Sequence, residues 1–197
     1  YFNTPGTYYV NNRLMRSDLY VDGPGTVVHV KNSRFVGPLT GILSYAVVAR
    51  HGAHVIVEDT EFKGATYDQA FSKTETGGRV DFYRVWAHGG ADDGFVVAGD
   101  AHVEDSYFGP DWLEPSTGRH TDAVQSSNGG VTSLTIKNNS FDLPWSINSA
   151  LFVEPFFGNG PGTVVIEHNS FSGGGYSVYV GDGNSGQHKI DKVRFKD

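Results

Sequence analysis

The sequence predicts an all-β protein that folds as a right-handed parallel β-helix, a solenoid of about seven coils. Short runs in which apolar and polar residues alternate recur every 22–33 residues along the chain. The composition combines 26 glycines with 13 phenylalanines and 10 tyrosines, which is typical of a β protein with many turns. We therefore expect one domain over residues 1–197.

Each repeat reads apolar–x–apolar–x–(Asn/Asp)–(Ser/Thr/Asn)–x–Phe, the pattern of a half-buried strand and a turn. The Asn or Asp predicts a tight turn, because these residues tolerate the left-handed backbone region. The Phe is expected to point back into the core. The third copy is degenerate and has Trp86 in the aromatic position. The copies are Val28–Phe35, Val55–Phe62, Val80–Trp86, Val103–Phe108, Leu134–Phe141, Val164–Phe171 and Ile190–Phe195.

A second strand is expected after each of these aromatic residues. Aligning the segments gives one column of small residues followed by one column of apolar residues. The small column is Ala46, Ala70, Gly94, Ala123, Ala150 and Ser177. The apolar column is Val47, Phe71, Phe95, Val124, Leu151 and Val178. We expect the apolar column in the core, and the small column facing out as the floor of a groove.

Charge and composition exclude several classes of partner. The formal net charge of −7 argues against nucleic acid, because phosphate binding needs clustered Lys and Arg. There is no Cys, and hence no disulfide framework or zinc–thiolate site. No apolar run approaches the ~20 residues that would span a membrane, so membrane insertion is not expected.

The two ends of the repeat array lead to an expectation about assembly. The chain starts at Tyr1 within structured-looking sequence, and the last repeat ends at residue 195 without a cover for its apolar face. Terminal repeats of a solenoid need a polar cap. We therefore expect a longer chain, a partner subunit or a larger assembly, for which a homotrimer is one suitable geometry.

Candidate functional residues gather in the stretch Gly118–Gly130. His120, Asp122 and Gln125 stand at the start of a short apolar run, and Asp93 holds the place of Asp122 in the preceding repeat. Adjacent strands of a sheet lie ~4.8 Å apart, so Asp93 and Asp122 should lie within reach of each other. Two carboxylates that close need a cation or a shared proton to lower their repulsion.

The same stretch resembles a known family. HTDAVQ, with SALFVEP and GGGYSVYV further on, is similar to the right-handed β-helix repeat proteins of actinobacteria and their phages, in which a motif reads like H-N-D-G-I-Q. These proteins belong to the pectin-lyase-like superfamily. The resemblance implies a polysaccharide-directed protein that is extracellular or virion-associated. Members differ widely in activity, so the fold alone does not select a reaction.

One interpretation is acid–base hydrolysis of a glycan. Glycosidases use two carboxyl groups that lie ~5 Å apart in retaining enzymes and ~6.5–9.5 Å apart in inverting enzymes. The order Asp68, Asp92, Asp93, His120 resembles that of the polygalacturonase-like β-helix hydrolases. The resemblance implies catalytic roles for Asp92, Asp93 and His120, and the stacking argument adds Asp122.

A second interpretation is β-elimination by a polysaccharide lyase. This reaction needs a base that takes the proton next to a uronate carboxylate, and a cation that neutralises this carboxylate. Asp93 and Asp122 could hold Ca²⁺ through oxygen ligands. The base or the cation could come from Arg119, His120, His88 or Lys73. Hydrolysis would require no cofactor.

A third interpretation makes the protein a glycan-binding or purely structural module, such as part of a phage tail spike or cell-surface protein. Polar residues such as Gln125 would then stack in ladders that satisfy one another.

If the protein binds a glycan, substrate contacts are expected from Asp68, Lys73, Arg119 and Gln125. Two aromatic residues in the longest loops, Trp112 and Phe156, either stack on sugar rings or close over the core as lids. An outward-facing Asp122 predicts that Asp122→Asn abolishes function and leaves the fold intact.

Overall fold

The computed structural model describes residues 1–37, 45–64, 70–75, 77–90, 93–112, 120–126, 133–153, 162–181 and 192–196. Within these ranges the regular elements are all strands, so the prediction of an all-β protein is confirmed. No helix of the described part is long and apolar enough to cross a bilayer.

The strands form three sheets. Sheet 1 contains β1 (Gly6–Asn11), β4 (Thr26–Lys31), β7 (His54–Glu58), β10 (Arg79–Tyr83), β13 (Asp100–Glu104), β16 (Ser133–Lys137), β19 (Thr163–Glu167) and β22 (Lys192–Lys196). Sheet 2 contains β2 (Leu14–Met15), β5 (Arg34–Val36), β8 (Glu61–Lys63), β11 (Trp86–His88), β14 (Tyr107–Gly109), β17 (Ser140–Leu143) and β20 (Ser170–Gly173). Sheet 3 contains β3 (Leu19–Asp22), β6 (Tyr45–Arg50), β9 (Ala70–Thr74), β12 (Phe95–Val97), β15 (Asp122–Ser126), β18 (Ser149–Val153) and β21 (Tyr176–Val180).

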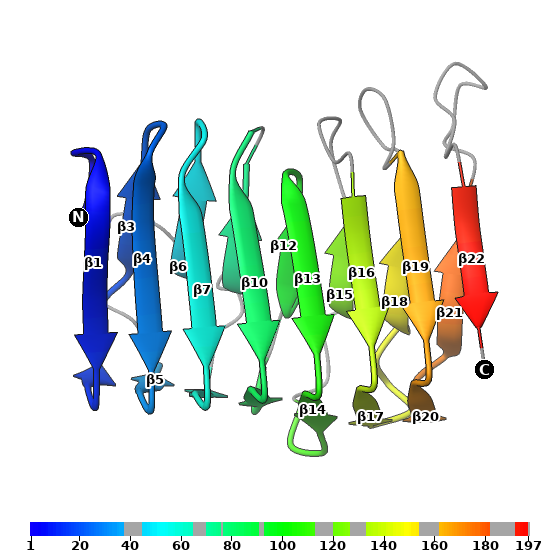
Figure 1. The fold of residues 1–197 in the computed structure, drawn as a ribbon. Coiled ribbons are helices and arrows are strands. Elements are labelled where there is room, and N and C mark those ends of the chain that lie inside the picture. Colours follow the sequence, from blue (N-terminus) through cyan, green and yellow to red (C-terminus); the bar gives the residue numbers. More distant parts are fainter. Residues whose placement is uncertain are drawn as a thin grey trace.

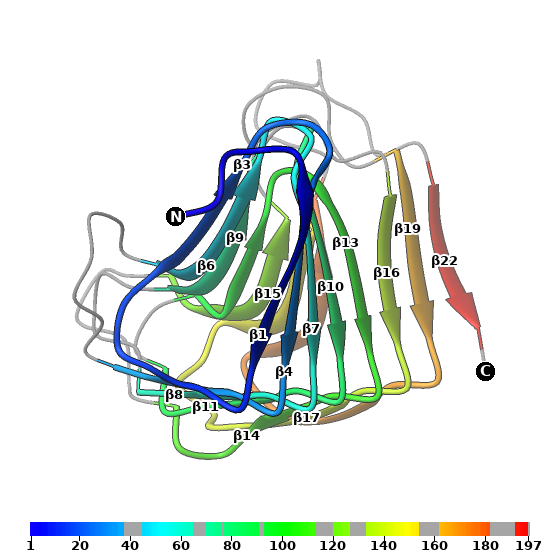
Figure 2. The same ribbon diagram turned by 60° about the vertical axis from the view of Figure 1, so that its left-hand side comes forward.

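The chain visits the three sheets in turn, and one such passage is called a circuit below. Every strand pairs in parallel with the strands that precede and follow it in the same sheet, as β4 does with β1 and β7. Figures 1 and 2 show the resulting row of strands from two sides. An all-β chain with this parallel, consecutive strand order is compatible with a parallel β-helix.

One left-handed residue marks each described turn from sheet 1 to sheet 2. Asn32, Asp59, Asp105 and Asn138 have φ angles of 49–54°, as the repeat pattern predicted. The degenerate third repeat keeps this geometry although its residue is Arg84 (φ 54°). The backbone turn is therefore more regular than the sequence that encodes it.

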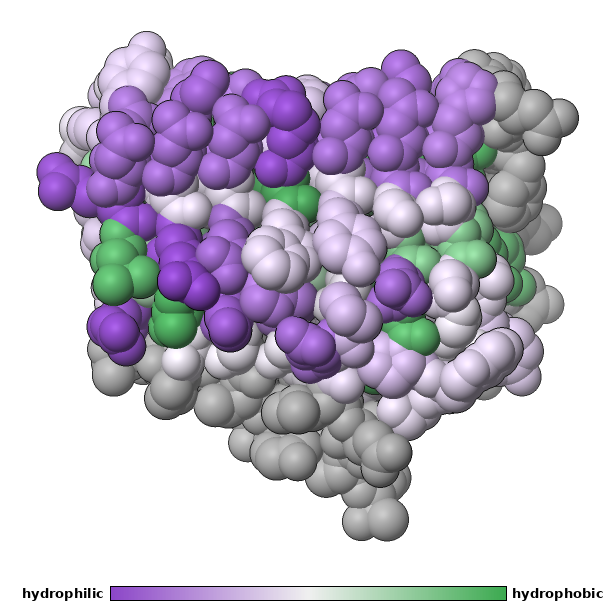
Figure 3. Space-filling model, turned by 90° about the horizontal axis from the view of Figure 1, so that it is seen from below, coloured by the Kyte–Doolittle hydropathy of each residue, from purple (hydrophilic) through white to green (hydrophobic). Residues whose placement is uncertain are grey.

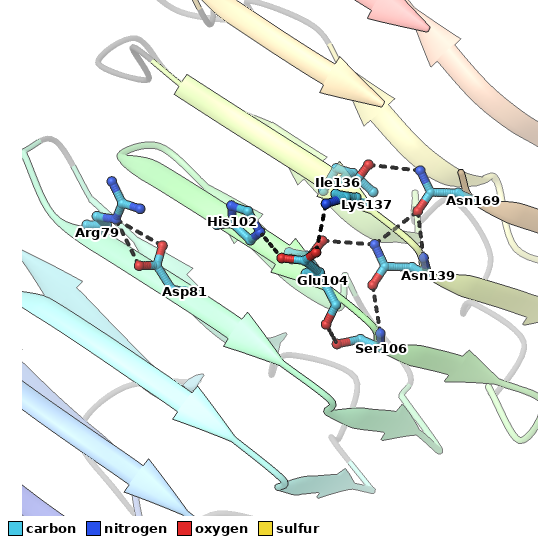
Figure 4. Close-up of polar contacts among 10 residues, drawn as sticks. Arg79, Asp81, His102, Glu104, Ser106, Ile136, Lys137, Asn139 and Asn169 are labelled. Atoms are coloured by element: carbon cyan, nitrogen blue, oxygen red, sulfur yellow. Dashed lines mark hydrogen bonds and ion pairs between the residues drawn. The ribbon is translucent and has the colours of Figure 1, made fainter. Parts of the chain in front are cut away.

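A ladder of side chains satisfies the backbone beneath these turns (Figure 4). Asn139 is buried, and its Oδ1 accepts a hydrogen bond from the Ser106 N–H at 2.9 Å. Its Nδ2 donates to the Val103 carbonyl at 2.9 Å, and its own N–H donates to Oδ1 of Asn169 at 2.8 Å. The second polar position of the repeat therefore connects one circuit to the next.

The core contains a row of stacked Phe rings with one interruption. Phe35 stacks on Phe62, with ring centroids 5.0 Å apart, and Phe108 stacks on Phe141 at 4.6 Å. The register places Ala87 between Phe62 and Phe108. The assignment of Trp86 to the aromatic core position is therefore wrong by one residue, since Ala87 holds that position.

Aromatic rings from the other two sheets fill the space beside Ala87. Phe95 of β12 packs edge-on against Phe62 at 5.8 Å and Phe108 at 5.2 Å. Phe82 of β10 stacks on Phe95 at 4.0 Å. Trp86 lies on the outer face of sheet 2 instead.

The register of sheet 3 corrects the alignment of its second repeat. Val47 pairs with Ser72, and Ser72 pairs with Phe95, so the segment containing Phe71 was aligned one residue out. The apolar column is otherwise in the core, as predicted, at Val47, Phe95, Val124 and Leu151.

The small column does not line an open groove. Ala46, Ala123 and Ala150 are all buried in the core cluster, although their strand positions alternate with those of the apolar column. The prediction of a groove floor is therefore wrong at these three positions.

We predict that Asn139→Ala lowers the free energy of unfolding by roughly 1–3 kcal/mol, because it leaves a buried N–H and a buried carbonyl without partners. Chemical denaturation of the purified protein measures this loss. Asn138→Gly is the matched control, because glycine also adopts the left-handed turn there. A variant of Asn139 as stable as the Asn138 control would show that the ladder adds nothing.

A second prediction concerns Asp81, a buried carboxylate on the outer side of β10. Burial raises its pKa, but hydrogen bonds from His54 at 2.8 Å and Arg79 at 2.9 Å outweigh this and leave the pKa below its usual 3.8. A depressed folded-state pKa stabilises the protein above the unfolded-state pKa of about 3.9, and this stabilisation disappears as the pH falls through the folded-state value.

Asp81→Asn should therefore destabilise the protein at neutral pH, and the difference from wild type should narrow below about pH 4. Denaturation curves over a pH series test this. Asp105→Asn serves as control because it keeps a turn-forming residue at an exposed position. A stability difference independent of pH would contradict the assigned role of the Asp81 charge.

Candidate functional site

The repeat register brings Asp93 and Asp122 together. Phe95 of β12 pairs with Val124 of β15, so the residues two positions earlier occupy equivalent places one circuit apart. The Asp122 N–H donates to Oδ1 of Asp93 at 2.9 Å, and the Gly94 N–H donates to the Asp122 carbonyl at 2.8 Å. The Asp93 carboxylate thus accepts a backbone hydrogen bond at the start of the next strand.

Asp122 points inward, which corrects the expectation of an outward side chain. It is 0 % exposed and shares a strand face with the core residue Val124, because alternate residues of a strand face the same side. Ser149, its partner in β18, donates its hydroxyl proton to Oδ1 of Asp122. A buried charge of this kind needs hydrogen-bond partners to be tolerated.

His120 lies beside the second oxygen of the same carboxylate. Its Nδ1 is 2.6 Å from Oδ2 of Asp122, although the two groups do not form an aligned hydrogen bond. The imidazole meets the ring of Phe152 edge-on at 4.5 Å, and its side chain remains 42 % exposed. Catalytic hydrogen bonds are often poorly aligned without substrate and tighten when it binds.

This arrangement can transfer a proton. A carboxylate at Nδ1 orients an imidazole and stabilises its charged form, which leaves Nε2 as the nitrogen for acid–base chemistry. Asp122 is suited to this positioning role because Ser149 and the strand fix it from behind. The exposed part of the His120 ring provides the access that Asp122 lacks.

Asp93, His120 and Asp122 also offer ligand atoms that all lie within 4.8 Å of one another, the one such group of three acidic or His side chains in the described ranges. Ca²⁺ takes six to eight oxygen ligands, whereas this set supplies two carboxylates and a nitrogen. One Asp122 oxygen is already occupied by Ser149. The three residues therefore fit Ca²⁺ poorly.

The remaining predicted residues are dispersed. Gln125 pairs with Val96, which pairs with Lys73, so the backbone places Gln125 and Lys73 in one row across sheet 3. His88 lies on sheet 2, away from this centre. Asp68, Asp92, Arg119 and Phe156 lie outside the described residues.

Trp112 is buried and does not offer a ring to sugars. A β-carbon at Gly90 would come within 2.5 Å of its indole, and one at Gly94 within 3.1 Å. The indole therefore packs on two glycines and belongs to the core cluster, which agrees with the alternative of a lid over the core.

Ser149 and Phe152 were not predicted as site residues from the sequence. The repeat alignment placed Ser149 at the position of Asp122, so a hydroxyl stacked on a carboxylate could have been found as a polar pair. Phe152 was assigned no role, yet it supports His120 and stacks on Tyr179 with ring centroids 4.9 Å apart.

Comparison of the chain with protein-family models, curated proteins and solved structures gave no match.

We predict that Asp122→Ala lowers the free energy of unfolding by roughly 1–3 kcal/mol, since the buried Ser149 hydroxyl loses its acceptor. Thermal and urea denaturation measure the effect. Gln125→Ala on the same strand is the control and should change stability by less than about 0.5 kcal/mol. Equal stability of both variants would indicate that the Asp122 side chain faces outward, as expected from the sequence.

Proposed function

We propose that the protein is a polysaccharide-directed right-handed parallel β-helix of the pectin-lyase-like type, with about seven coils in one domain. In this proposal it cleaves a glycan, and His120 transfers the proton. The three parallel sheets with consecutive strand order support the fold, and the HTDAVQ resemblance at residues 120–125 supports the substrate class.

The pairing of His120 with Asp122 carries the proposal. One partner is a fully buried carboxylate fixed by Ser149, and the other is an imidazole open to solvent. A proton-transfer group that is oriented from behind and accessible in front is what general acid–base catalysis requires.

Hydrolysis of a neutral glycan is favoured over elimination. Asp93 and Asp122 place carboxylates at His120, and this charge opposes binding of the uronate that elimination requires. Ca²⁺ at Asp93 and Asp122 would relieve the repulsion, but the donor set fits that ion poorly. Asp122 is too buried to reach a substrate together with Asp93. The groups proposed to reach the substrate are therefore His120 and the half-buried Asp93.

A second candidate function is glycan binding without cleavage. The hydrogen bonds of both carboxylates favour it, because Asp93 accepts a backbone N–H and Asp122 accepts the Ser149 hydroxyl. Such contacts also occur where acidic residues only join neighbouring circuits. A module of this kind would serve in a tail spike or on a cell surface.

The proposal also includes location and assembly. A polysaccharide-directed β-helix would act outside the cell or on a virion, and a homotrimer or larger assembly would bury its end circuits. Mass measurement in solution tests the assembly, and a stable monomer of this chain would contradict it.

The activity test uses neutral and acidic polysaccharides with two product assays. Release of reducing ends alone indicates hydrolysis, whereas an additional ultraviolet-absorbing unsaturated product indicates elimination. We expect hydrolysis of a neutral polymer, with kcat/KM about 10²–10⁴-fold lower in His120→Ala. His102→Ala is the matched control, since His102 also contacts a carboxylate, Glu104, at 2.9 Å but lies on sheet 1.

Two results would count against the proposal. Equal loss in the His120 and His102 variants would mean that His120 has no special role. Binding of a glycan without any cleavage would replace the catalytic proposal with the binding module.

A further inference from the structure

The outer face of sheet 2 carries two adjacent aromatic side chains, on another sheet than the strand that follows His120. Trp86 of β11 pairs with Tyr107 of β14, while the next residue of each strand, Ala87 and Phe108, points into the core. Figure 3 views this face, where pale residues of intermediate hydropathy lie in the middle beside hydrophilic ones. Because the strands pair in register, the two side chains are neighbours on the surface.

The ring of Tyr107 lies flat on its own strand. A β-carbon at Gly109 would come within 2.3 Å of the Tyr107 ring, so the ring occupies the space that a side chain there would need. Gly109 is not among the residues with positive φ, so its backbone does not require glycine. We conclude that the glycine serves to let the tyrosine ring lie down on the sheet.

The ring of Trp86 also lies flat on its strand, β11, which is next to β14. Its ring stacks on that of His88, two residues further along, with centroids 3.9 Å apart and 13° between the planes. Trp86 is 43 % exposed, whereas the His88 side chain beneath it is only 3 % exposed. Nε2 of His88 contacts Glu61 at 2.9 Å, and Glu61 also pairs with Arg34 at 2.7 Å. The Trp86 indole therefore packs on a His88 ring that is held in place by Glu61.

Polar groups border the two rings. Asp111 is 73 % exposed, and its Oδ2 lies 3.8 Å from the otherwise unbonded Nδ1 of His88. On the other side, the Tyr107 hydroxyl donates to Asp142 at 3.4 Å. The surface is thus a flat aromatic patch with carboxylates at its edges.

We propose that Trp86 and Tyr107 form a binding platform for a neutral sugar chain. The negative faces of aromatic rings attract the partly positive C–H faces of sugars, and flat rings offer large contact area at low entropic cost. Asp111 and Asp142 can accept hydrogen bonds from sugar hydroxyls. The same carboxylates oppose the binding of phosphate and uronate chains.

This platform shares its ligand class with the proposed function but does not need His120. It lies on sheet 2, whereas the candidate catalytic residues lie at the start of β15 in sheet 3. Its role would be to hold one segment of the polymer while another segment of the same polymer reaches the candidate site at His120. Loss of the platform should therefore weaken binding of the polymer.

Affinity electrophoresis tests the platform, with gels that contain hydroxyethylcellulose, galactomannan or polygalacturonate. We expect retardation by a neutral polymer, and an about tenfold weaker apparent Kd for Trp86→Ala and for Tyr107→Ala. Gly109→Ala should weaken binding in the same direction, because the new methyl group displaces the Tyr107 ring. Circular dichroism confirms that each variant is folded.

Tyr9→Ala is the matched control. Tyr9 is 69 % exposed and stacks on His29 at 5.2 Å, but it lies on sheet 1. Equal weakening by Tyr9→Ala, full binding by both platform variants, preference for polygalacturonate, or no binding to any polymer would each overturn the proposal. Retardation in the gels reports on the platform, and release of reducing ends reports on His120, so failure of the platform and failure of the catalytic proposal give different results.

Discussion

Parallel pairing of each strand with its equivalent in the next circuit is the constraint on which the rest of the structure depends. Because the register is kept from strand to strand, each side chain meets the residue at the same repeat position one circuit away. Like groups are thereby brought together whether or not they attract. Phe rings benefit by stacking, and the Asn139 side chain benefits by donating a hydrogen bond to Oδ1 of Asn169.

Carboxylates gain nothing from being stacked on one another, and the structure shows how the repulsion is limited. Asp93 accepts the Asp122 N–H, whereas Asp122 turns inward to Ser149 and His120. The two charges therefore have different partners although they hold equivalent positions. This division also separates their chemistry, because one carboxylate stays partly accessible and the other can only orient its neighbour.

The outer faces of sheets 2 and 3 differ in what covers the small residues that alternate with the core. In sheet 3 the small residues Ala123 and Ala150 are buried, and Trp112 covers Gly94. In sheet 2 the glycine at position 109 instead makes room for a ring that lies flat and stays partly open to solvent. Small residues therefore close one surface and shape another, depending on which side chain lies over them.

The sequence alone determined the all-β class, the strand positions of the repeats and the left-handed turns, because alternation and turn residues act over a few neighbours. It also placed Asp93 and Asp122 one repeat apart. Tertiary structure decided matters of one residue: Trp86 rather than Ala87 faces solvent, and the backbone of Ser72 rather than that of Phe71 pairs with Val47 and Phe95. It also decided that Asp122 is buried. A strand reverses its faces with each single-residue shift, and only pairing with neighbouring strands fixes that shift.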